Sequence, residues 1–316
     1  MITFRRAAHR LVEFFFPPES DAWLACLRAG LGLQVIFYAL SLRKDWNEMF
    51  GPTASGLVGR EIAEAILATN SALAPRITWL TALAGQLGLS EELVLSVTWW
   101  ILLVAGGFLF LGLFSRGAAV VAWFIHLCAV GSGELLLYGA DSFTSIGLFY
   151  LMLAPLPDKW TVDARWRRGG RNDPHLLGLF RRVLQVHLCL VYFFGGLAKC
   201  LGSGWWNGAS VWRALTRPPF NVISPEILVS WRYFFPAAGI VVCLFEIGYA
   251  FLIWPRKTRL LCLIGMVSVH IGIALTMGMY LFSFIMIVLN MAAFGAGLIR
   301  FPFAIGRESP AVSSTV

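Results

Sequence analysis

Long apolar runs separated by short polar segments dominate the chain. A transmembrane helix needs about 20 mostly apolar residues, and eight runs come close to or exceed that length. They lie at about residues 22–41, 93–114, 117–137, 142–157, 183–202, 236–254, 259–277 and 280–299. The pattern predicts an all-α fold, a polytopic integral membrane bundle of about eight transmembrane helices.

The polar remainder divides into short segments rather than soluble domains. We expect a cytoplasmic N-terminal segment at residues 1–21, a transmembrane domain at 22–300 and a cytoplasmic tail at 301–316. The tail is too short to bury a core of its own. The bundle is therefore the one folded domain that the sequence predicts.

Two longer segments, 42–92 and 203–235, separate spans on the side opposite the N-terminus. The first contains the amphipathic stretches GREIAEAILATN and ITWLTALAGQLG, and its end places Ser90 as the N-cap of the next span. The second is rich in tryptophan, a ring that settles at membrane–water interfaces, and its RPP sequence breaks any helix. We expect both segments to form interfacial helices that roof a site near the outer leaflet.

Composition and charge agree with a membrane protein and set its orientation. Hydrophobic residues make up 58% of the chain and charged residues 13%, whereas soluble domains average roughly 45–50% and about 25%. With the N-terminus inside, 16 of the 25 Lys and Arg residues lie inside, seven lie outside, and Arg28 and Lys199 lie within spans. This excess predicts an N-in, C-in topology. The net charge of +8 therefore indicates orientation and lipid contact, and we expect no nucleic-acid partner.

Several common kinds of site have no motif in the sequence. All six cysteines lie in apolar runs without a CxxC pair, which is typical of small hydrophobic residues in helix packing. The chain also has no zinc motif, P-loop, dinucleotide glycine fingerprint or GxSxG. We expect no metal site.

The stretch VYFFGGLAKCLGSGWW places a lysine, Lys199, near the end of an apolar run. Its amine either snorkels to the interface, since a charged lysine at the bilayer centre costs ~2.5–3.5 kcal/mol, or serves as a buried base. Gln185, Tyr192 and Lys199 are spaced seven apart and share one helical face. Gly195 and Gly196 thin the helix beside that face. A polar stripe next to a groove favours a site, and both interpretations stay open from this stretch alone.

Other polar residues inside spans also need partners, because ionisable groups in a membrane are costly and usually face the bundle interior. His270 is typical of an interhelical hydrogen-bonding residue, and Glu246 needs a proton or a partner. Arg28 could pair with Glu246. Asp141 and Glu134 lie near one outer turn, where Asp141 is typical of a capping residue.

Depth along the spans brings several of these residues to the same side. The predicted topology places Lys199, Tyr138 and Asp141 toward the outer leaflet, with His270 and Glu246 somewhat deeper. We expect them to contribute to one site. Sequence gives depth but not helix adjacency, so their convergence is a prediction for the tertiary structure to decide.

The segment QVHLCLVYFFGGLAKCLGSGWWNGASVWRAL resembles the signature segment of vitamin K-dependent gamma-carboxylase-like proteins, the group with horizontally transferred transmembrane (HTTM) domains. CLRAGLG, GGFLFLGLFSR, DKWTVD and VHIGIALTMGMYLFSF resemble other parts of that family in the same order. The resemblance extends over about residues 20–300.

The resemblance implies an enzyme that acts on an isoprenoid quinol, vitamin K or menaquinol, with oxygen and carbon dioxide as co-substrates. In the carboxylase, a lysine at the position of Lys199 deprotonates vitamin K hydroquinone, and the strong base formed with oxygen removes a proton from a protein glutamate that then captures carbon dioxide. A low-dielectric pocket disfavours the ammonium form, so a neutral amine can act as general base. The implied roles are catalytic for Lys199 and His270, pocket-forming for Tyr192, Gly195, Gly196, Tyr138, Asp141, Trp205 and Trp206, and supporting for Arg28, Glu246 and Gln185.

Two departures separate the chain from the carboxylase. It ends almost at its last span, so we expect a short form without the extramembrane C-terminal domain, and Asp141 stands where the family enzyme carries a histidine. Short bacterial members of the group assist the maturation of secreted peptides, so we expect a multi-pass protein of a bacterial plasma membrane rather than the endoplasmic reticulum.

The expected partners are the lipid bilayer, a secreted peptide or protein substrate and a soluble partner subunit. One alternative function is that of a non-enzymatic membrane partner for maturation or export of a secreted peptide. Another is a small-solute transporter, although the chain lacks the paired broken helices typical of such folds.

Overall fold

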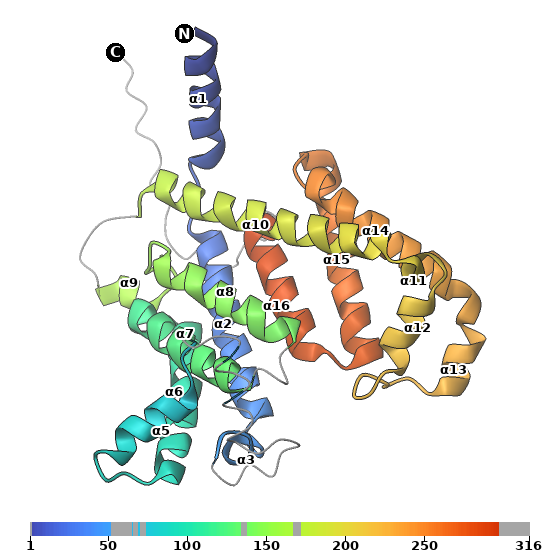
Figure 1. The fold of residues 1–316 in the computed structure, drawn as a ribbon. Helices are drawn as coiled ribbons and strands as arrows, with labels where there is room; N and C mark the ends of the chain where they lie inside the picture. Colours follow the sequence, from blue (N-terminus) through green and yellow to red (C-terminus); the bar gives the residue numbers. More distant parts are fainter. Residues whose placement is uncertain are drawn as a thin grey trace, which may run out of the picture.

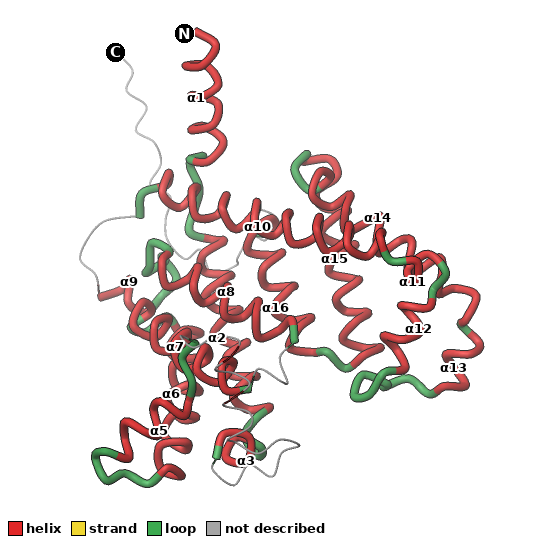
Figure 2. Tube along the Cα trace, in the orientation of Figure 1, coloured by secondary structure: helices red, strands yellow, loops and turns green. Residues whose placement is uncertain are grey.

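The computed structural model describes residues 2–51, 65, 69, 74–133, 138–166 and 172–296. All regular structure in these ranges is helical (Figure 2). Six described helical segments are long and apolar enough to cross a membrane: α2 (Ala22–Ser41), α6 (Glu91–Leu111), α7 (Ser115–Ser132), α10 (Pro174–Leu201), the Arg232–Leu252 segment that contains η2 (Arg232–Phe234) and α14 (Phe235–Leu252), and α15 (Arg256–Met277). The predicted class, an all-α polytopic membrane bundle, is confirmed.

Two further apolar helices are shorter than the spans expected at 142–157 and 280–299. α8 (Gly139–Leu153) has 15 residues, and α16 (Tyr280–Asn290) has 11 before it continues into the π-helical turn η3 (Met291–Gly295). A straight 15-residue helix is about 22 Å long, against a hydrocarbon core of about 30 Å. The count of eight spans and the N-in, C-in topology therefore stay predictions.

Capping residues explain where two of the long helices, α6 and α10, begin. α6 starts after Ser90, whose hydroxyl accepts a hydrogen bond from the backbone N–H of Leu93 at 3.4 Å, as expected. α10 starts before the predicted span at 183–202. Asp173 accepts from the N–H of His175 at 2.8 Å and proline holds the first helical position, a favoured start for a helix.

Shorter helices precede the first span or lie between the spans. They are α1 (Ile2–Phe15), α3 (Trp46–Phe50), α5 (Ile77–Gly85), α9 (Val162–Trp166), α11 (Ser203–Trp206), α12 (Ala209–Thr216) and α13 (Pro225–Ser230). Both segments expected to form interfacial helices contain short helices joined by turns and loops where they are described, whereas most of GREIAEAILATN, Glu134 and the 301–316 tail lie outside the described residues. α1 projects away from the bundle, and α11, α12 and α13 gather beyond the end of α10 (Figure 1).

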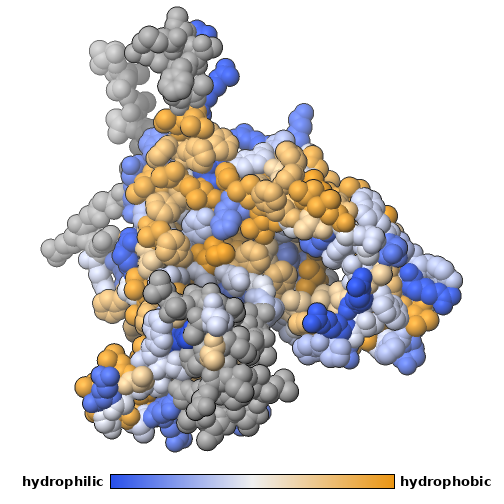
Figure 3. Space-filling view, viewed as in Figure 1, coloured by the Kyte–Doolittle hydropathy of each residue, from blue (hydrophilic) through white to orange (hydrophobic). Residues whose placement is uncertain are grey.

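The described core is apolar and centres on α2, which contacts α6, α8 and α16. Large hydrophobic side chains also remain exposed on the outside of the bundle, including Leu201, Leu261 and Leu275. Hydrophobic residues cover much of the helical surface, and hydrophilic residues gather around α12 and α13 (Figure 3). Extensive exposed apolar surface is expected of helices that face lipid.

Arg28 is buried inside this core, and its partner is not the one expected. Its Nε donates to Asp158 Oδ2 at 2.6 Å, and its Nη1 donates to the carbonyls of Leu109 and Phe110 at 2.6 and 2.9 Å. The expectation that Arg28 pairs with Glu246 is wrong, because the loop after α8 places Asp158 beside Arg28 on α2. Arg28 therefore ties α2, α6 and this loop together.

Asp163, in α9, caps the start of α7. Its carboxylate accepts from the N–H groups of Phe114 and Ser115 at 2.8 and 2.7 Å and from the Ser115 hydroxyl at 2.8 Å. Partial burial acts to raise the pKa of Asp163, but these hydrogen bonds outweigh it and hold the pKa below its ordinary value. The α6–α7 turn is thus tied to the loop after α8.

Candidate functional site

The candidate site is a mostly apolar cavity of about 900 Å³ between α10, α12, α14, α15 and α16. We call it the lysine cavity. Its polar or aromatic lining includes Tyr192, Lys199, Trp205, Glu246 and His270, together with Gly195 and apolar residues such as Leu215, Val269, Ile273, Met277, Phe282 and Met286. Five residues of the predicted site, and one of its supporting residues, thus line one cavity.

Lys199 and Glu246 form an ion pair in the wall of the lysine cavity. The lysine side chain is 27% exposed and the glutamate side chain 12%. Trp205 adds a cation–π contact, with its ring centre 5.5 Å from Nζ. Sequence reasoning treated Lys199 as a solitary amine, whereas α14 supplies it with a carboxylate partner, so proton chemistry here belongs to the pair.

The two glycines beside Lys199 have different roles. A Cβ at Gly195 would lie 3.7 Å from Glu246 Oε2 and 3.9 Å from Lys199 Nζ, which is ordinary contact. A Cβ at Gly196 would lie 2.9 Å from the backbone nitrogen of Ile247 and 2.9 Å from Glu246 Cβ. Gly195 therefore leaves room at the ion pair, and Gly196 allows α10 and α14 to approach closely and does not line the cavity.

A chain of buried hydrogen bonds runs behind the cavity wall. The hydroxyl of Tyr192 lies 2.8 Å from His270 Nε2 and 2.7 Å from Asn290 Nδ2. The Tyr249 hydroxyl donates to Asn290 Oδ1 at 2.6 Å. His270 is the interhelical hydrogen-bonding residue that was expected, with Tyr192 as its partner.

Asn290 and Tyr249 were not singled out from the sequence, because neither is spaced seven residues from an ionisable residue of its own span, as Tyr192 is from Lys199. A lone Asn at the end of the apolar run YLFSFIMIVLN is the signal that could have found it. A buried amide carries four hydrogen-bonding positions that need partners, so it predicts a local polar network.

Gln185 supports the site from outside the cavity. Its Nε2 and the Nε of Arg181 both donate to the carbonyl of Ala293, at 2.6 and 3.0 Å. Ala293 belongs to the π turn that directly follows Asn290, and such turns leave carbonyls free of their usual helical partners. Of the polar residues predicted to share one face of α10, Gln185 therefore binds the π turn, and Tyr192 and Lys199 line the cavity.

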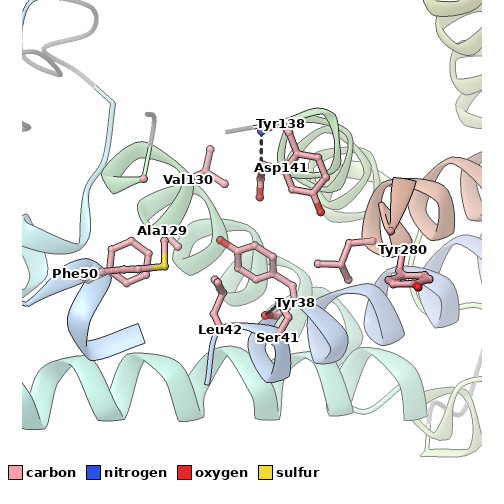
Figure 4. Close-up of a pocket in the computed structure, with 13 residues that line it drawn as sticks. Tyr38, Ser41, Leu42, Phe50, Ala129, Val130, Tyr138, Asp141 and Tyr280 are labelled. Carbon is pink, nitrogen blue, oxygen red and sulfur yellow. Dashed lines mark hydrogen bonds between the residues drawn. The ribbon is translucent and has the colours of Figure 1, made fainter. Parts of the chain in front are cut away.

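Tyr138 and Asp141 lie in a different cavity, of about 470 Å³, which Tyr38 and Tyr280 also line (Figure 4). We call it the tyrosine cavity. Asp141 Oδ2 accepts from the backbone N–H of Tyr138 at 3.2 Å, so it caps α8, as its sequence position indicated. These two residues therefore do not share the cavity of Lys199. The α15–α16 turn borders both cavities, with Gly278 lining the tyrosine cavity and Met279 the lysine cavity.

Two other predicted site residues also lie outside the lysine cavity. Trp206 is 44% exposed and its indole N–H donates to the carbonyl of Cys200 at 2.7 Å. Arg28 lies in the core with Asp158, so its contribution is structural. No group of three His, Cys, Asp or Glu side chains in the described part of the chain is arranged to hold a metal ion.

The fold and this cavity define a polytopic helical membrane protein with a polar cluster inside an apolar chamber. Comparison with known families identifies the HTTM domain over residues 86–296, which is more than half of the chain. The chain therefore belongs to the HTTM domain family. No curated protein and no solved structure matches it.

The matched range begins just before α6 and ends with the π turn, so it includes every residue that lines the lysine cavity. α2, which carries Arg28, precedes it. The domain bounds expected from the apolar pattern, 22–300, stay a prediction.

Proposed function

We propose that this protein is a membrane enzyme of the vitamin K-dependent gamma-carboxylase-like type, in which the Lys199–Glu246 pair removes a proton from an isoprenoid quinol bound in the lysine cavity. The observation that carries the proposal is an ion pair in the wall of a mostly apolar cavity of about 900 Å³. Partly buried ionisable pairs in a cavity are typical of sites that move protons.

The lining suits such a ligand. Apolar side chains such as Leu215, Ile273 and Met277 match an aromatic ring and isoprenoid tail, and Lys199, Glu246 and His270 supply the few polar groups that orient a ligand in an apolar pocket. An isoprenoid quinol held there would supply an acidic hydroxyl and reducing equivalents, with oxygen and carbon dioxide as co-substrates. The acceptor would be a secreted peptide or protein.

The pair can supply a base without placing a net charge in the membrane. Lys199 and Glu246 carry no net charge together, whether as ammonium and carboxylate or as amine and carboxylic acid. A low dielectric constant disfavours the separated charges of the first form. When Glu246 holds the proton, the neutral amine of Lys199 can accept a proton from a hydroxyl within hydrogen-bonding reach.

Quinone content tests the binding step. We expect protein purified from menaquinone-containing membranes to retain quinone, detected by solvent extraction and mass spectrometry. Gly195→Leu, which fills the space beside the ion pair, should abolish this content. Gly107→Leu is the matched control, because a Cβ at Gly107 meets no atom within 4 Å. A quinone-free wild-type protein from such membranes would overturn the proposal.

A double variant tests the chemistry. Lys199→Met/Glu246→Gln removes the base and leaves no uncompensated charge in the bundle. We expect the wild type to catalyse the oxygen-dependent oxidation of a short-chain menaquinol, and we expect the double variant to retain quinone and to lose this activity. Unchanged oxidation in the double variant would assign the reaction to other groups or to none.

A further inference from the structure

One arrangement of protons gives an acceptor to every donor in the hydrogen bonds that join His270, Tyr192, Asn290 and Tyr249. Met286 lies one helical turn before Asn290, and its backbone carbonyl can only accept. The side-chain atom of Asn290 that lies 2.8 Å from this carbonyl is therefore the amide nitrogen. This contact fixes the orientation of the amide.

The directions of the other hydrogen bonds follow from the orientation of the Asn290 amide. The second N–H of Asn290 donates to the Tyr192 hydroxyl oxygen at 2.7 Å, and Asn290 Oδ1 accepts from the Tyr249 hydroxyl at 2.6 Å. Tyr192 accepts a hydrogen bond from Asn290, and His270 Nε2, 2.8 Å away, is the acceptor that the described residues offer to the hydroxyl proton of Tyr192. Nε2 is thus the acceptor, and a neutral imidazole then carries its proton on Nδ1.

This Nδ1–H group has no hydrogen-bond partner within the described part of the chain. His270 is 4% exposed and lines the lysine cavity. A buried N–H without a partner is costly and rare in folded proteins, and a ligand is one of the groups that can satisfy it. The aromatic rings that contact His270, Tyr192 and Phe282, offer no acceptor at Nδ1.

We propose that His270 is a fixed hydrogen-bond donor, through Nδ1–H, to an oxygen acceptor of the ligand in the lysine cavity, and that Tyr192, Asn290 and Tyr249 are the positioning residues that hold it in this tautomer. The identity of the ligand rests on the proposed function, in which one oxygen of the quinol faces the Lys199–Glu246 pair and the other accepts from His270. A ligand with an acceptor at each end of its ring is thereby selected.

The same hydrogen bonds argue against His270 as the group that removes a proton from the ligand. A proton could leave through Nε2 only by way of Tyr192 and Asn290, and an amide does not pass protons onward under ordinary conditions. His270 therefore orients and polarises the ligand, whereas proton removal belongs to Lys199 and Glu246.

Nitrogen NMR of the full-length protein tests the tautomer. With ¹⁵N-labelled histidine, the signal lost in His270→Asn identifies His270, and we expect a protonated Nδ1 and an unprotonated, hydrogen-bonded Nε2. Tyr192→Phe should change this signal. Tyr150→Phe is the matched control, because Tyr150 makes the same kind of contact to His187, at 2.9 Å, and should alter only that signal. A proton on Nε2 of His270 in the wild type would overturn the inference.

Equilibrium binding of a short-chain menaquinone tests the donor. His270→Leu should weaken binding by about tenfold, the loss expected for one buried hydrogen bond, and His270→Asn, whose amide N–H can occupy the place of Nδ1–H, should weaken it less. Equal binding by wild type and His270→Leu would overturn the donor role. If the wild type does not bind the quinone and His270 still carries its proton on Nδ1, the proposed function fails, because another acceptor is then the ligand.

Discussion

At the scale of single residues, the two cationic residues that the sequence places within spans, Arg28 and Lys199, differ in their surroundings. Arg28 is buried and donates three hydrogen bonds to groups of the fold, namely the Asp158 carboxylate and the carbonyls of Leu109 and Phe110. Lys199 has one carboxylate, one aromatic ring and open cavity around it. A charged side chain that donates its hydrogen bonds to the protein core stabilises the fold. A charged side chain that lines a cavity can also interact with a ligand.

We expect Arg28→Met to destabilise the protein strongly. Asp158, whose side chain is 0% exposed, would lose its cationic partner, and breaking a buried pair in this way costs about 3–5 kcal/mol. Thermal unfolding in detergent measures the loss, and Lys257→Ala at an exposed position is the control. Arg28→Met/Asp158→Asn should recover part of it, and a single variant as stable as the wild type would contradict the structural role.

Asp163 gives a pH-dependent prediction. Because hydrogen bonds hold its folded-state pKa below the ordinary value of 3.8, its contribution is present at neutral pH and is lost as the pH falls through the folded-state pKa. Asp163→Asn should therefore cost about 1 kcal/mol at pH 7, as for other helix caps, and progressively less below pH 4.

Unfolding of wild type and Asp163→Asn between pH 7 and pH 3 checks this expectation. Asp45→Asn is the control, because the Asp45 side chain makes no capping hydrogen bond, and it should show no such difference. A gap that widens as the pH falls would show that the sign is wrong.

At the scale of elements, α10 organises the site through one face. Arg181 and Gln185 hold the π turn, Tyr192 joins the hydrogen-bond chain, and Lys199 pairs with α14. Its residues are spaced so that successive members follow the same side of the helix. The position of Asn290 depends on this face, since the π turn begins directly after it.

The two glycines of α10 provide an element-scale prediction. Gly196→Ala should destabilise the protein by about 1–3 kcal/mol, because the new methyl group would meet the backbone of α14 and force α10 and α14 apart. Gly195→Ala should be tolerated or slightly stabilising, because its methyl group meets only ordinary contacts and alanine favours a helix. Thermal unfolding of the two variants in parallel measures the difference. Equal stability of the two would contradict the close approach at Gly196.

At the scale of the whole molecule, the beginning and the end of the described chain lie at the same end of the bundle. Arg181 bridges them, since its Nη1 donates to Glu19 and its Nε to Ala293, at 2.6 and 3.0 Å. The loop that carries Asp158 meets α2 near the same end, where Lys159 N–H donates to Asp21. An even number of membrane crossings would produce this arrangement, in agreement with the predicted N-in, C-in topology.

Reporter fusions test the topology. Green fluorescent protein at the N-terminus should fluoresce, because it folds only inside the cell, and alkaline phosphatase fused after Arg217 should be active, because it folds only outside. Phosphatase fused after Arg116 is the control and should be inactive. The reverse pattern would contradict the orientation and move the lysine cavity to the inner half of the membrane.

The sequence determined the class of fold, the approximate positions of the long helices and the placement of Lys199, Tyr192 and His270 as polar residues in apolar runs. These follow from local physical rules, because each apolar run must hydrogen-bond its own backbone in lipid and each buried polar group needs a partner. Capping at Ser90 and Asp141 is local in the same way. Residues near in sequence settle such features, so periodicity and turn chemistry are enough to predict them.

Partner choice was decided only by the tertiary structure. Lys199 pairs with Glu246 on α14, Arg28 pairs with Asp158 from a loop 130 positions away, and Tyr138 and Asp141 lie in a second cavity. Sequence gives the depth of a residue in the membrane but not which helices are neighbours. Long-range helix packing fixes which polar groups meet, and therefore decides which of them can form a site.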